Sequence, residues 1–431
     1  MNKRPRGSIA TRIRAFLARE AVLAVAAAAA LASCTLVPPD AAYAHYIDWH
    51  TLALLFCLMT VVAGFRKLGV LDAAGAWLVA RARTPRAVAA ALVALAFFAS
   101  MLVTNDVALI TFVPLALVVL RRANMEARLC LVATLMTAAA NLGSMLTPVG
   151  NPQNLYLFTA SGMSIREFLQ LMAPYTLASA ALLAAVIALA FREKPTQMAK
   201  SKTVAGSVAV ARNRQQDHRE SNADVNDAST FCSPSVPGPS EGERPGGQTK
   251  PFEFTAHPIR FALYLVLFIA CLVAVAGVLD VRALLAVVLL ATALSDASLL
   301  RRVDWGLLAT FVALFVFVGN MARVPLLHDA LAAAVDGNAL LAAVGASQVI
   351  SNVPAAVLLS GFTAQWSALI VGTNLGGLGT LIASMASLIT FKAVSVGRAG
   401  IRTHYLRTFT LVNVAFLTAL LALAFVFGPT A

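Results

Sequence analysis

Charge is scarce in this sequence: Asp, Glu, Lys and Arg make up 12% of its 431 residues, about half the share in an average soluble domain. Hydrophobic residues make up 59%, too much for a soluble core to bury. Stretches almost without charge recur, and most approach the roughly 20 residues that a bilayer core demands of a helix. They cover residues 21–39, 87–104, 107–120, 168–190, 261–279, 305–322 and 408–428. The composition predicts an all-α polytopic membrane protein.

Paired cysteines and metal-ligand clusters are missing as well. The five cysteines contain no CxxC pair, and four of them lie in apolar stretches, as small buried hydrophobes do. Four histidines near the predicted membrane interfaces have no Cys or acid at ligand spacing. These are His45, His50, His328 and His404. We therefore expect no cofactor, and no metal beyond a coupling Na+.

The formal net charge of +13 does not indicate nucleic-acid binding, because Lys and Arg cluster at the ends of apolar stretches. That placement sets membrane topology, since positive charge is enriched in cytoplasmic loops. Residues 1–20 form a basic segment that we expect in the cytoplasm, followed by a first transmembrane helix at 21–39. The alternative for this helix is a cleaved signal peptide, because Ala42-Tyr43-Ala44 resembles a signal-peptidase site.

Residues 192–257 interrupt the apolar pattern with Ser, Pro, Gly, Gln and mixed charge. Such a segment cannot bury enough apolar area to fold. We predict a disordered cytoplasmic linker between two membrane halves, followed by connecting transmembrane helices at 258–299.

The two halves contain a weak internal repeat, predicted at 47–191 and 303–428. The matching runs are Ile47-Asp48-Trp49 with Val303-Asp304-Trp305, Thr104-Asn105-Asp106 with Ser351-Asn352-Val353, and Asn141-Leu142-Gly143 with Asn374-Leu375-Gly376. Thr147 and Thr380 fall at the same offset beyond the last pair. The order of these matches indicates that each half repeats the same elements.

Charge gives the two repeats opposite orientations. Asp48 follows a run without Lys or Arg, whereas Asp304 follows the pair Arg301-Arg302. Arginines also bracket the first predicted hairpin, while no Lys or Arg lies between Val324 and Phe391 around the second. Equivalent points therefore lie on opposite sides of the membrane. Inverted repeats are typical of secondary transporters.

Each repeat is expected to contain five elements in the same order. A spanning helix (50–65; 304–321) is followed by a short interfacial helix (70–83; 325–336) and a re-entrant hairpin (86–120; 338–362). A transmembrane helix broken in mid-membrane (127–160; 366–391) and a closing helix (167–191; 405–428) complete the repeat. With helices at 258–277 and 281–299, the chain would cross nine times and end outside.

The two hairpin tips and the two breaks are irregular, and in a bilayer such backbone survives only where protein or a water-filled cavity surrounds it. Freed N–H groups there suit an anion, and freed carbonyls suit a cation. A single Gly or Ser in a membrane helix usually serves close packing, but four clusters at matching positions favour one binding centre. The candidate solute-binding residues are Thr104, Asn105, Asn141, Gly143, Thr147, Pro148, Gly150, Asn151, Asn154, Ser351, Asn352, Pro354, Thr373, Asn374, Gly376, Gly377, Thr380 and Ser384. The candidate coupling-ion residues are Asp106, Asn105, Asn352 and Ser351.

Asp106 differs from these neutral groups, because a carboxylate in the bilayer is costly and functional by default. It binds a cation, carries a proton, or caps the second arm of the hairpin as an N-cap acid, and the sequence does not decide among these three roles. Lys392 ends the second broken helix. There it either faces an anionic solute or, as we favour, snorkels to the interface.

At these motifs the sequence resembles the ion transporter superfamily, which includes divalent anion/sodium symporters, citrate transporters, arsenite permeases and D-type sodium/proton antiporters. The likeness is carried by Thr104 to Pro114, Asn141 to Asn154, Ser351-Asn352 and Thr373 to Ser387. It is greatest to a citrate-transporter-like, inner-membrane branch with an Ile-Asp-Trp-His-Thr start, here Ile47 to Thr51. The resemblance implies a homodimer and an elevator-like movement.

In the symporters of this superfamily, a Ser-Asn-Thr triplet at each hairpin tip holds sodium and substrate. Those positions are filled here by Thr104-Asn105-Asp106 and Ser351-Asn352-Val353, so only the Asn is retained at both tips. Val353 offers no hydroxyl, and Asp106 would repel an anion unless it is protonated or cation-bound. Dicarboxylate specificity therefore does not carry over directly.

We expect a secondary transporter in the inner membrane that moves a small anion coupled to Na+ or H+. The anion would be a carboxylate such as citrate or a dicarboxylate, or an inorganic oxyanion. The alternative is an arsenite efflux permease or a Na+/H+ antiporter that uses Asp106. A remote alternative is an intramembrane enzyme, but the chain lacks the paired acids, Ser/His or metal-ligand groupings that catalysis needs.

Overall fold

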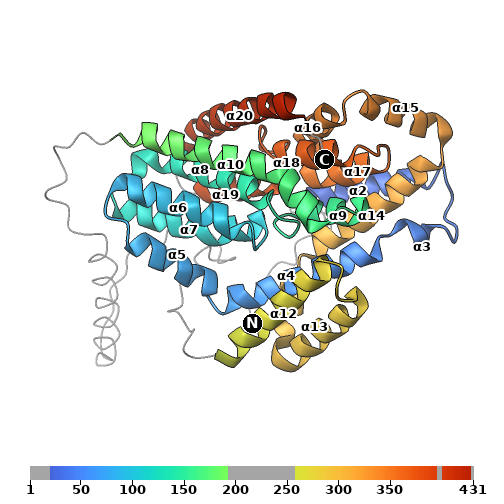
Figure 1. Cartoon of the computed structure of the whole chain (residues 1–431), viewed down its shortest axis with the longest axis horizontal. Helices are drawn as coiled ribbons and strands as arrows, with labels where there is room; N and C mark the ends of the chain where they lie inside the picture. Colours follow the sequence, from blue (N-terminus) through green and yellow to red (C-terminus); the bar gives the residue numbers. More distant parts are fainter. Residues whose placement is uncertain (1–19, 193–257, 396–399, 429–431) are drawn as a thin grey trace, which may run out of the picture.

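The computed structural model describes residues 20–192, 258–395 and 400–428. Within these ranges the chain is helical and contains no strand. The predicted basic N-terminus, apart from Glu20, and the predicted linker, apart from Arg192, lie outside the described residues. Figure 1 shows helices from both halves of the chain packed together in one body.

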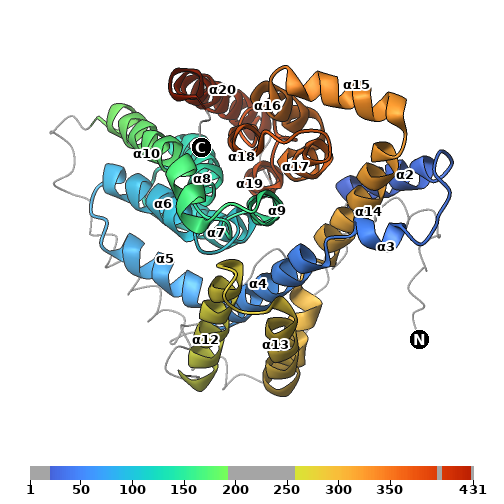
Figure 2. The same ribbon diagram turned by 45° about the vertical axis from the view of Figure 1, so that its right-hand side comes forward.

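The helices form two parts, which Figure 2 separates most clearly. We call the first part the side layer. It consists of α2 (Ala21–Ser33), α3 (Tyr43–Tyr46), α4 (Trp49–Lys67), α12 (Pro258–Val275), α13 (Val281–Asp296), the 3-10 helix η2 (Ala297–Arg302) and α14 (Trp305–Ala322). Within it α2 lies along α14, and α12 and α13 pack on α4.

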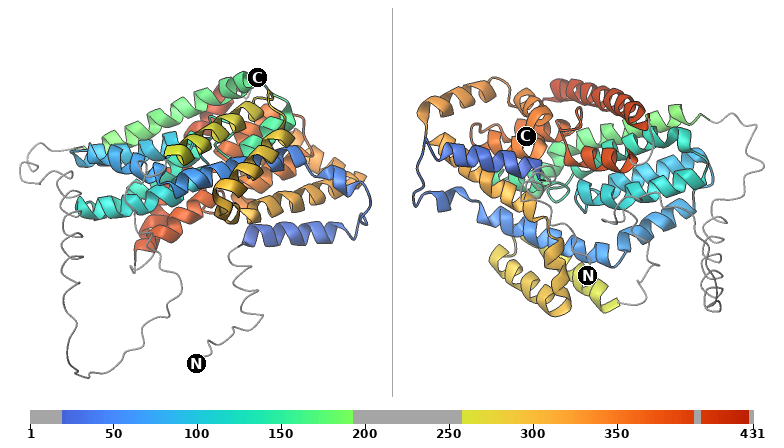
Figure 3. Two further views of the ribbon diagram at one scale, coloured as in Figure 1. Left: turned by 90° about the horizontal axis from the view of Figure 1, so that it is seen from below. Right: turned by 180° about the vertical axis from the view of Figure 1, so that it is seen from behind.

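We call the second part the central bundle. Its first-half members are α6 (Pro85–Ala99), α7 (Asn105–Arg122), the 3-10 helix η1 (Glu126–Arg128), α8 (Leu129–Ser144), α9 (Pro152–Ser161) and α10 (Ile165–Ala190). Its second-half members are α16 (Ala339–Ile350), α17 (Asn352–Ser360), α18 (Trp366–Leu375), α19 (Met385–Val394) and α20 (Ile401–Phe427). The closing helices α10 and α20 lie next to each other on the outside of the bundle (Figure 3).

Two short helices, α5 (Val70–Ala80) and α15 (Pro325–Asp336), connect the side layer to the bundle as arms (Figure 2). The α5 arm begins after Gly69, whose φ of +70° is the left-handed conformation that favours glycine. The α15 arm meets α16 at a bend of 108°. In each half the order is thus a long helix, an arm, a helix pair, an interrupted pair and a closing helix.

The first helix of each half begins in the same way. Asp48 accepts a hydrogen bond from Thr51 N at 3.0 Å, and Asp304 accepts one from Leu307 N at 2.9 Å, so each aspartate caps its helix. The tryptophan after each aspartate donates its indole N–H to the carbonyl five residues earlier, at 3.4 Å from Trp49 and at 3.0 Å from Trp305. Both tryptophans are more than half exposed, as side chains at membrane interfaces are.

Helices α4 and α14 run in opposite directions. The C-terminal end of α4 lies beside the end of α13 and the start of η2, because Lys67 pairs with Asp296 and donates to Ser298 Oγ at 2.9 Å. Trp305, the first residue of α14, packs against Phe56 in the middle of α4, with the ring centroids 5.8 Å apart. The other end of α14 lies beside the start of α4, where Arg323 donates to the Tyr46 hydroxyl at 3.0 Å. A Cβ on Gly319 would lie 2.4 Å from the Tyr46 ring, so this approach requires glycine.

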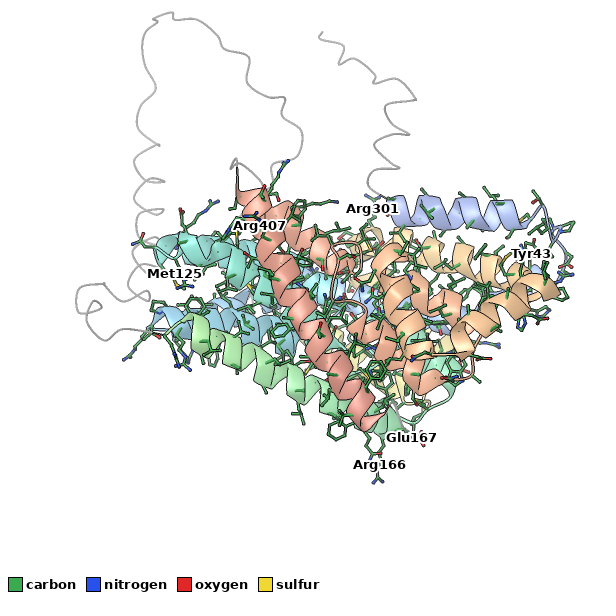
Figure 4. The ribbon with its side chains drawn as sticks, turned by 90° about the horizontal axis from the view of Figure 1, so that it is seen from above. Tyr43, Met125, Arg166, Glu167, Arg301 and Arg407 are labelled. Atoms are coloured by element: carbon green, nitrogen blue, oxygen red, sulfur yellow. The ribbon has the colours of Figure 1, made fainter. Side chains whose placement is uncertain are left out.

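The N-terminal segment is fastened to the far end of α14. Asn320, which is fully buried, donates to Ser33 Oγ at 2.9 Å and to the Tyr43 hydroxyl at 2.8 Å. The Arg323 guanidinium donates to Asp40 at 2.7 Å, and this hydrogen bond holds the pKa of the Asp40 carboxyl below its usual range. Figure 4 shows Tyr43 and Met125 at opposite ends of the molecule.

Seven of the described helices are long and apolar enough to cross a membrane, or eight if the bent pair α15 and α16 counts as one span. This confirms the predicted all-α polytopic membrane protein. The nine predicted crossings stay a prediction. Helix α2 ends at Ser33 rather than at residue 39, and Pro38 and Pro39 cannot continue a helix. Its 13 residues reach roughly 20 Å, short of the roughly 30 Å hydrocarbon core.

Candidate functional site

The two predicted hairpin tips are sharp turns between short helices. Helix α6 ends at Ala99, Thr104 is extended with φ −60° and ψ 149°, and α7 begins at Asn105. In the second half, Ser351 alone separates α16 from α17. Its φ of +74° is rare for a residue with a Cβ. Such strain persists only where surrounding structure fixes it, which is common at binding sites.

The two predicted broken helices are also interrupted where the Gly and Pro residues fall. Residues 145–151 separate α8 from α9, and residues 376–384 separate α18 from α19. Asn105 N donates to Gly150 O at 3.3 Å, and Asn352 N donates to Ala383 O at 3.0 Å. Each hairpin tip is therefore hydrogen-bonded to the unwound segment of its own half.

Asn141, near the end of α8, joins the two halves. Its Oδ1 accepts from Asn105 Nδ2 at 2.9 Å and from Ser384 Oγ at 3.0 Å, while its Nδ2 donates to Gly377 O at 3.3 Å. The amide is buried, with the side chain 4% exposed. One carboxamide thus links the first tip, the first broken helix and the second unwound segment.

Asn374 stands at the matching position of α18 and also links the two halves, through a hydrogen bond to Asn154. Its Nδ2 donates to Asn154 Oδ1 at 2.7 Å. Asn154 Nδ2 in turn lies within 3.3 to 3.5 Å of the carbonyls of Ser144, Met145 and Thr147. The two broken helices are consequently cross-linked by carboxamides at the middle of the bundle, and we call the residues of these hydrogen bonds the amide network.

The same contacts occur at matching positions of the two halves. Thr147 Oγ1 donates to Met101 O at 2.5 Å, and Thr380 Oγ1 donates to Gln348 O at 3.1 Å. An added Cβ on Gly143 would lie 2.8 Å from Ser100 Oγ, and one on Gly376 would lie 2.6 Å from Ser347 Oγ. These glycines bring each broken helix against its hairpin.

Asp106 lies in the first turn of α7, beside the amide network. Its Oδ1 is enclosed and has no hydrogen-bond partner among the described residues. An enclosed carboxylate oxygen costs free energy unless a proton or a cation occupies it. The geometry therefore leaves the cation and proton roles open and shows no backbone N–H that donates to Oδ1, as the cap role would require.

The remaining predicted residues differ in what they contact. Asn151 donates to Ser144 Oγ at 2.7 Å, while its Oδ1 has no partner within the described ranges. Ser351 Oγ is 3.3 Å from Ala383 O. Pro148 and Pro354 are buried beside the first break and in the first turn of α17. Thr373 does not join the network, because its hydroxyl donates to Leu369 O of its own helix at 2.8 Å.

Three residues of this centre were not predicted from the sequence. Ser144 accepts from Asn151, and Gln153, 1% exposed, has an Nε2 without a partner among the described atoms. Gln348 of α16 bonds three backbone groups of the second unwound segment. A polar carboxamide in an otherwise apolar hairpin arm is the signal that would have marked Gln348.

Apolar helices interrupted in mid-span, with buried polar groups facing one another there, define a membrane transporter rather than a receptor or an enzyme. Comparison with known proteins agrees with this class. A family model described as citrate transporter matches residues 9–375. The chain belongs to the citrate transporter family.

Relatives of this chain include proteins named as transporters and an inner membrane protein. An uncharacterized transporter of Methanocaldococcus jannaschii is 29% identical over 361 residues, which is 82% of this chain and 84% of the relative. Inner membrane protein YbiR of Escherichia coli is 30% identical over 366 residues, 83% of each chain. A silicon efflux transporter of Oryza sativa is 33% identical over 142 residues, 33% of this chain and 29% of that protein. The function is therefore transport across a membrane and not catalysis.

Proposed function

We propose that this protein is a secondary carrier of the inner membrane that moves a small anion together with Na+ or H+. The observation that carries the proposal is the amide network, in which Asn141 and Asn374 join two helices interrupted in mid-span. Unwound backbone at that depth is costly unless it is buried in protein or lines a water-filled cavity, and a path for a polar solute needs such a cavity. The family and the YbiR relative support the same reading.

Helix ends gather at this centre in a way that suits both an anion and a cation. Helices α7, α9, α17 and α19 begin at the tips and breaks, so their N-terminal N–H groups and positive dipole ends collect there. Helices α6, α8, α16 and α18 end there, so carbonyls that helical hydrogen bonds leave over also collect at this centre. An anion bound by the first set, next to a cation bound by the second, is the arrangement of coupled carriers.

Asp106 makes coupling necessary rather than optional. It is the charged member of the group of candidate site residues, and the others are amides, hydroxyls, Gly and Pro. A negative solute beside an ionised Asp106 would be repelled, so the carboxylate must be neutralised by Na+ or H+ when the anion binds. The solute would be a carboxylate such as citrate or a dicarboxylate, or an inorganic oxyanion.

The test is uptake by purified protein in liposomes under an imposed sodium gradient or an imposed pH gradient. Citrate, succinate, sulfate and phosphate are compared, and thermal stabilisation in detergent ranks the same solutes, since a ligand that binds the folded state raises its stability. We expect one of these anions to enter only when one of the two gradients is present. Movement of no anion under either gradient would refute the proposal.

A second candidate is efflux, either of a neutral hydroxide such as arsenite or of sodium in exchange for protons. It is favoured by the uncharged character of most of the amide network, and by the name of the Oryza sativa relative, which is a silicon efflux transporter. In this case Asp106 is the carrier of the exchanged ion. Arsenite-driven or sodium-driven proton movement in the same liposomes, without anion uptake, would select this candidate.

The orientation and assembly belong to the same proposal. The charge distribution favours a cytoplasmic location for the N-terminus and for the 192–257 linker. The superfamily resemblance implies a homodimer that moves its site by an elevator-like displacement. The opposite directions of α4 and α14 support two inverted repeats.

A further inference from the structure

The side chain of Gln348 is hydrogen-bonded to the backbone of the second unwound segment. It lies in α16, four residues before the tip residue Asn352. Its Nε2 donates to Gly376 O at 2.8 Å and to Leu378 O at 2.9 Å. Its Oε1 accepts from Thr380 N at 2.8 Å. One side chain therefore satisfies three backbone groups that no helix satisfies.

The unwound segment is shaped around this side chain. Gly379 has a φ of +103°, and a Cβ added there would lie 2.3 Å from Gln348 Oε1. The Thr380 hydroxyl also donates to the backbone carbonyl of Gln348 at 3.1 Å. Glycine at 379 is thus required both by its backbone conformation and by the approach of the carboxamide.

In the first half, a side chain at a different position contacts the matching backbone carbonyl. Met101 stands at the position that matches Gln348, four residues before Asn105, and its side chain offers no comparable donor. Met145 O, which matches Leu378 O, instead lies 3.5 Å from Asn154 Nδ2. The position that matches Asn154 in the second half is Ser387, which is fully buried and whose Oγ has no partner among the described residues.

We propose that Gln348 is a positioning residue of the solute site, and this proposal rests on the proposed transport function. By holding the carbonyls of Gly376 and Leu378 and the N–H of Thr380, it fixes the second unwound segment. That segment then presents Gly377 O to Asn141 and Ala383 O to Asn352 N. Because Gln348 belongs to α16, its side chain ties the second unwound segment to the second hairpin, whereas Asn154, whose side chain contacts the carbonyls of the first unwound segment, belongs to α9.

The decisive variants give the second half the residues that stand at the matching positions of the first half. Gln348→Met installs the residue of the first half and removes the three side-chain hydrogen bonds to the second unwound segment. Gln348→Met combined with Ser387→Asn then supplies the carboxamide that the first half uses at the matching position. Gln365→Met is the matched control, because Gln365 is exposed and its amide donates at 3.2 Å to Asp336 O, outside the amide network.

The first readout is backbone hydrogen exchange of purified protein, which needs no solute. We expect exchange in the 376–384 peptide to be about tenfold faster in Gln348→Met, since buried hydrogen bonds are lost. The double variant should return exchange to within about threefold of the native protein, and Gln365→Met should leave it unchanged. Unchanged exchange in Gln348→Met, or no recovery in the double variant, would overturn the proposal.

The second readout is sodium-dependent or proton-dependent citrate uptake in liposomes. A misplaced binding segment should raise the half-saturating citrate concentration about tenfold with little change in the maximal rate. A lower maximal rate at an unchanged half-saturating concentration would show that Gln348 merely aids folding, and would overturn its positioning role. If the native protein moves no citrate, the proposed citrate transport fails and the hydrogen-exchange result alone decides the role of Gln348.

Discussion

At the scale of single residues, the carboxamide side chains of Asn and Gln make the hydrogen bonds that connect the elements at the centre of this protein. Asn and Gln present a donor and an acceptor on one planar group, so one side chain can bridge a carbonyl and an N–H without adding net charge. In hydrocarbon this matters, because each unsatisfied backbone group costs several kcal/mol. Asn141, Asn154, Asn374 and Gln348 each satisfy groups of more than one element or segment.

Removing the Asn141 carboxamide should lower the stability of the protein by breaking the amide network. Asn141→Ala leaves Asn105 Nδ2, Ser384 Oγ and Gly377 O without this partner, and at about 1–3 kcal/mol for each buried group we expect a loss of about 3 kcal/mol or more in stability. The control is Asn413→Ala, because Asn413 is equally buried but donates only to Phe409 O of its own helix. Thermal unfolding in detergent compares the two, and equal losses would contradict a special role for Asn141.

We expect the carboxylate of Asp106 to be required for coupled transport but not for folding. Asp106→Asn keeps the shape of the side chain but cannot gain or lose a proton or pair with Na+ as a carboxylate. We expect coupled transport or exchange in liposomes to fall to background, while the thermal unfolding midpoint stays near that of the native protein. Native transport rates in this variant would remove Asp106 from the mechanism and would end the antiporter alternative.

At the scale of helices, the N-terminal segment packs into the side layer through the contacts of α2 and α3 with α14. Cleavage after Ala44 would remove Ser33 and Tyr43, the two acceptors of the fully buried Asn320 amide. An unpaired buried amide costs about 1–3 kcal/mol. We therefore expect residues 21–44 to remain in the mature protein, and an intact-mass measurement beginning at His45 would contradict this.

The same segment offers a stability comparison. Asn320→Ala should lower the thermal unfolding midpoint clearly, because both of its buried contacts are lost. Arg323→Ala removes only an exposed ion pair to Asp40 and one hydroxyl contact, and such pairs contribute little. A midpoint lowered more by Arg323→Ala than by Asn320→Ala would show that the outer ion pair, not the buried amide, fastens the segment.

Much of this layout was predictable, because the apolar runs set the helices and the Gly and Pro clusters set the breaks. The predicted 325–336 helix agrees with α15, and the predicted 50–65 helix lies within α4. Side-chain direction was not predictable. Thr373 turns to its own helix although it lies next to Asn374, and Gln348 reaches a segment 28 to 32 residues away. Residue type and spacing fix neither rotamers nor partners across a bundle.

At the scale of the whole molecule, opposite orientation of the halves is the claim that organises the rest. Trp49 and Trp305 start equivalent helices and are 62% and 56% exposed, so both positions are accessible to reagents. Trp49→Cys and Trp305→Cys, each in a background without the native cysteines, should be labelled by an impermeant thiol reagent from opposite sides. We expect Trp49→Cys to react in intact cells and Trp305→Cys only after the membrane is opened. Labelling of both from one side would refute the inverted arrangement.

The crossing hydrogen bonds also constrain biogenesis. Asn141 must wait for Gly377, which is synthesised 236 residues later, and Asn154 must wait for Asn374 across 220 residues. At about 5–20 residues per second, translation leaves Asn141 Nδ2 and Asn154 Oδ1 without these partners for roughly 10–50 s. A nascent first half therefore holds buried polar groups that only the second half can pair, so the fold of the centre is completed only after both halves have been made.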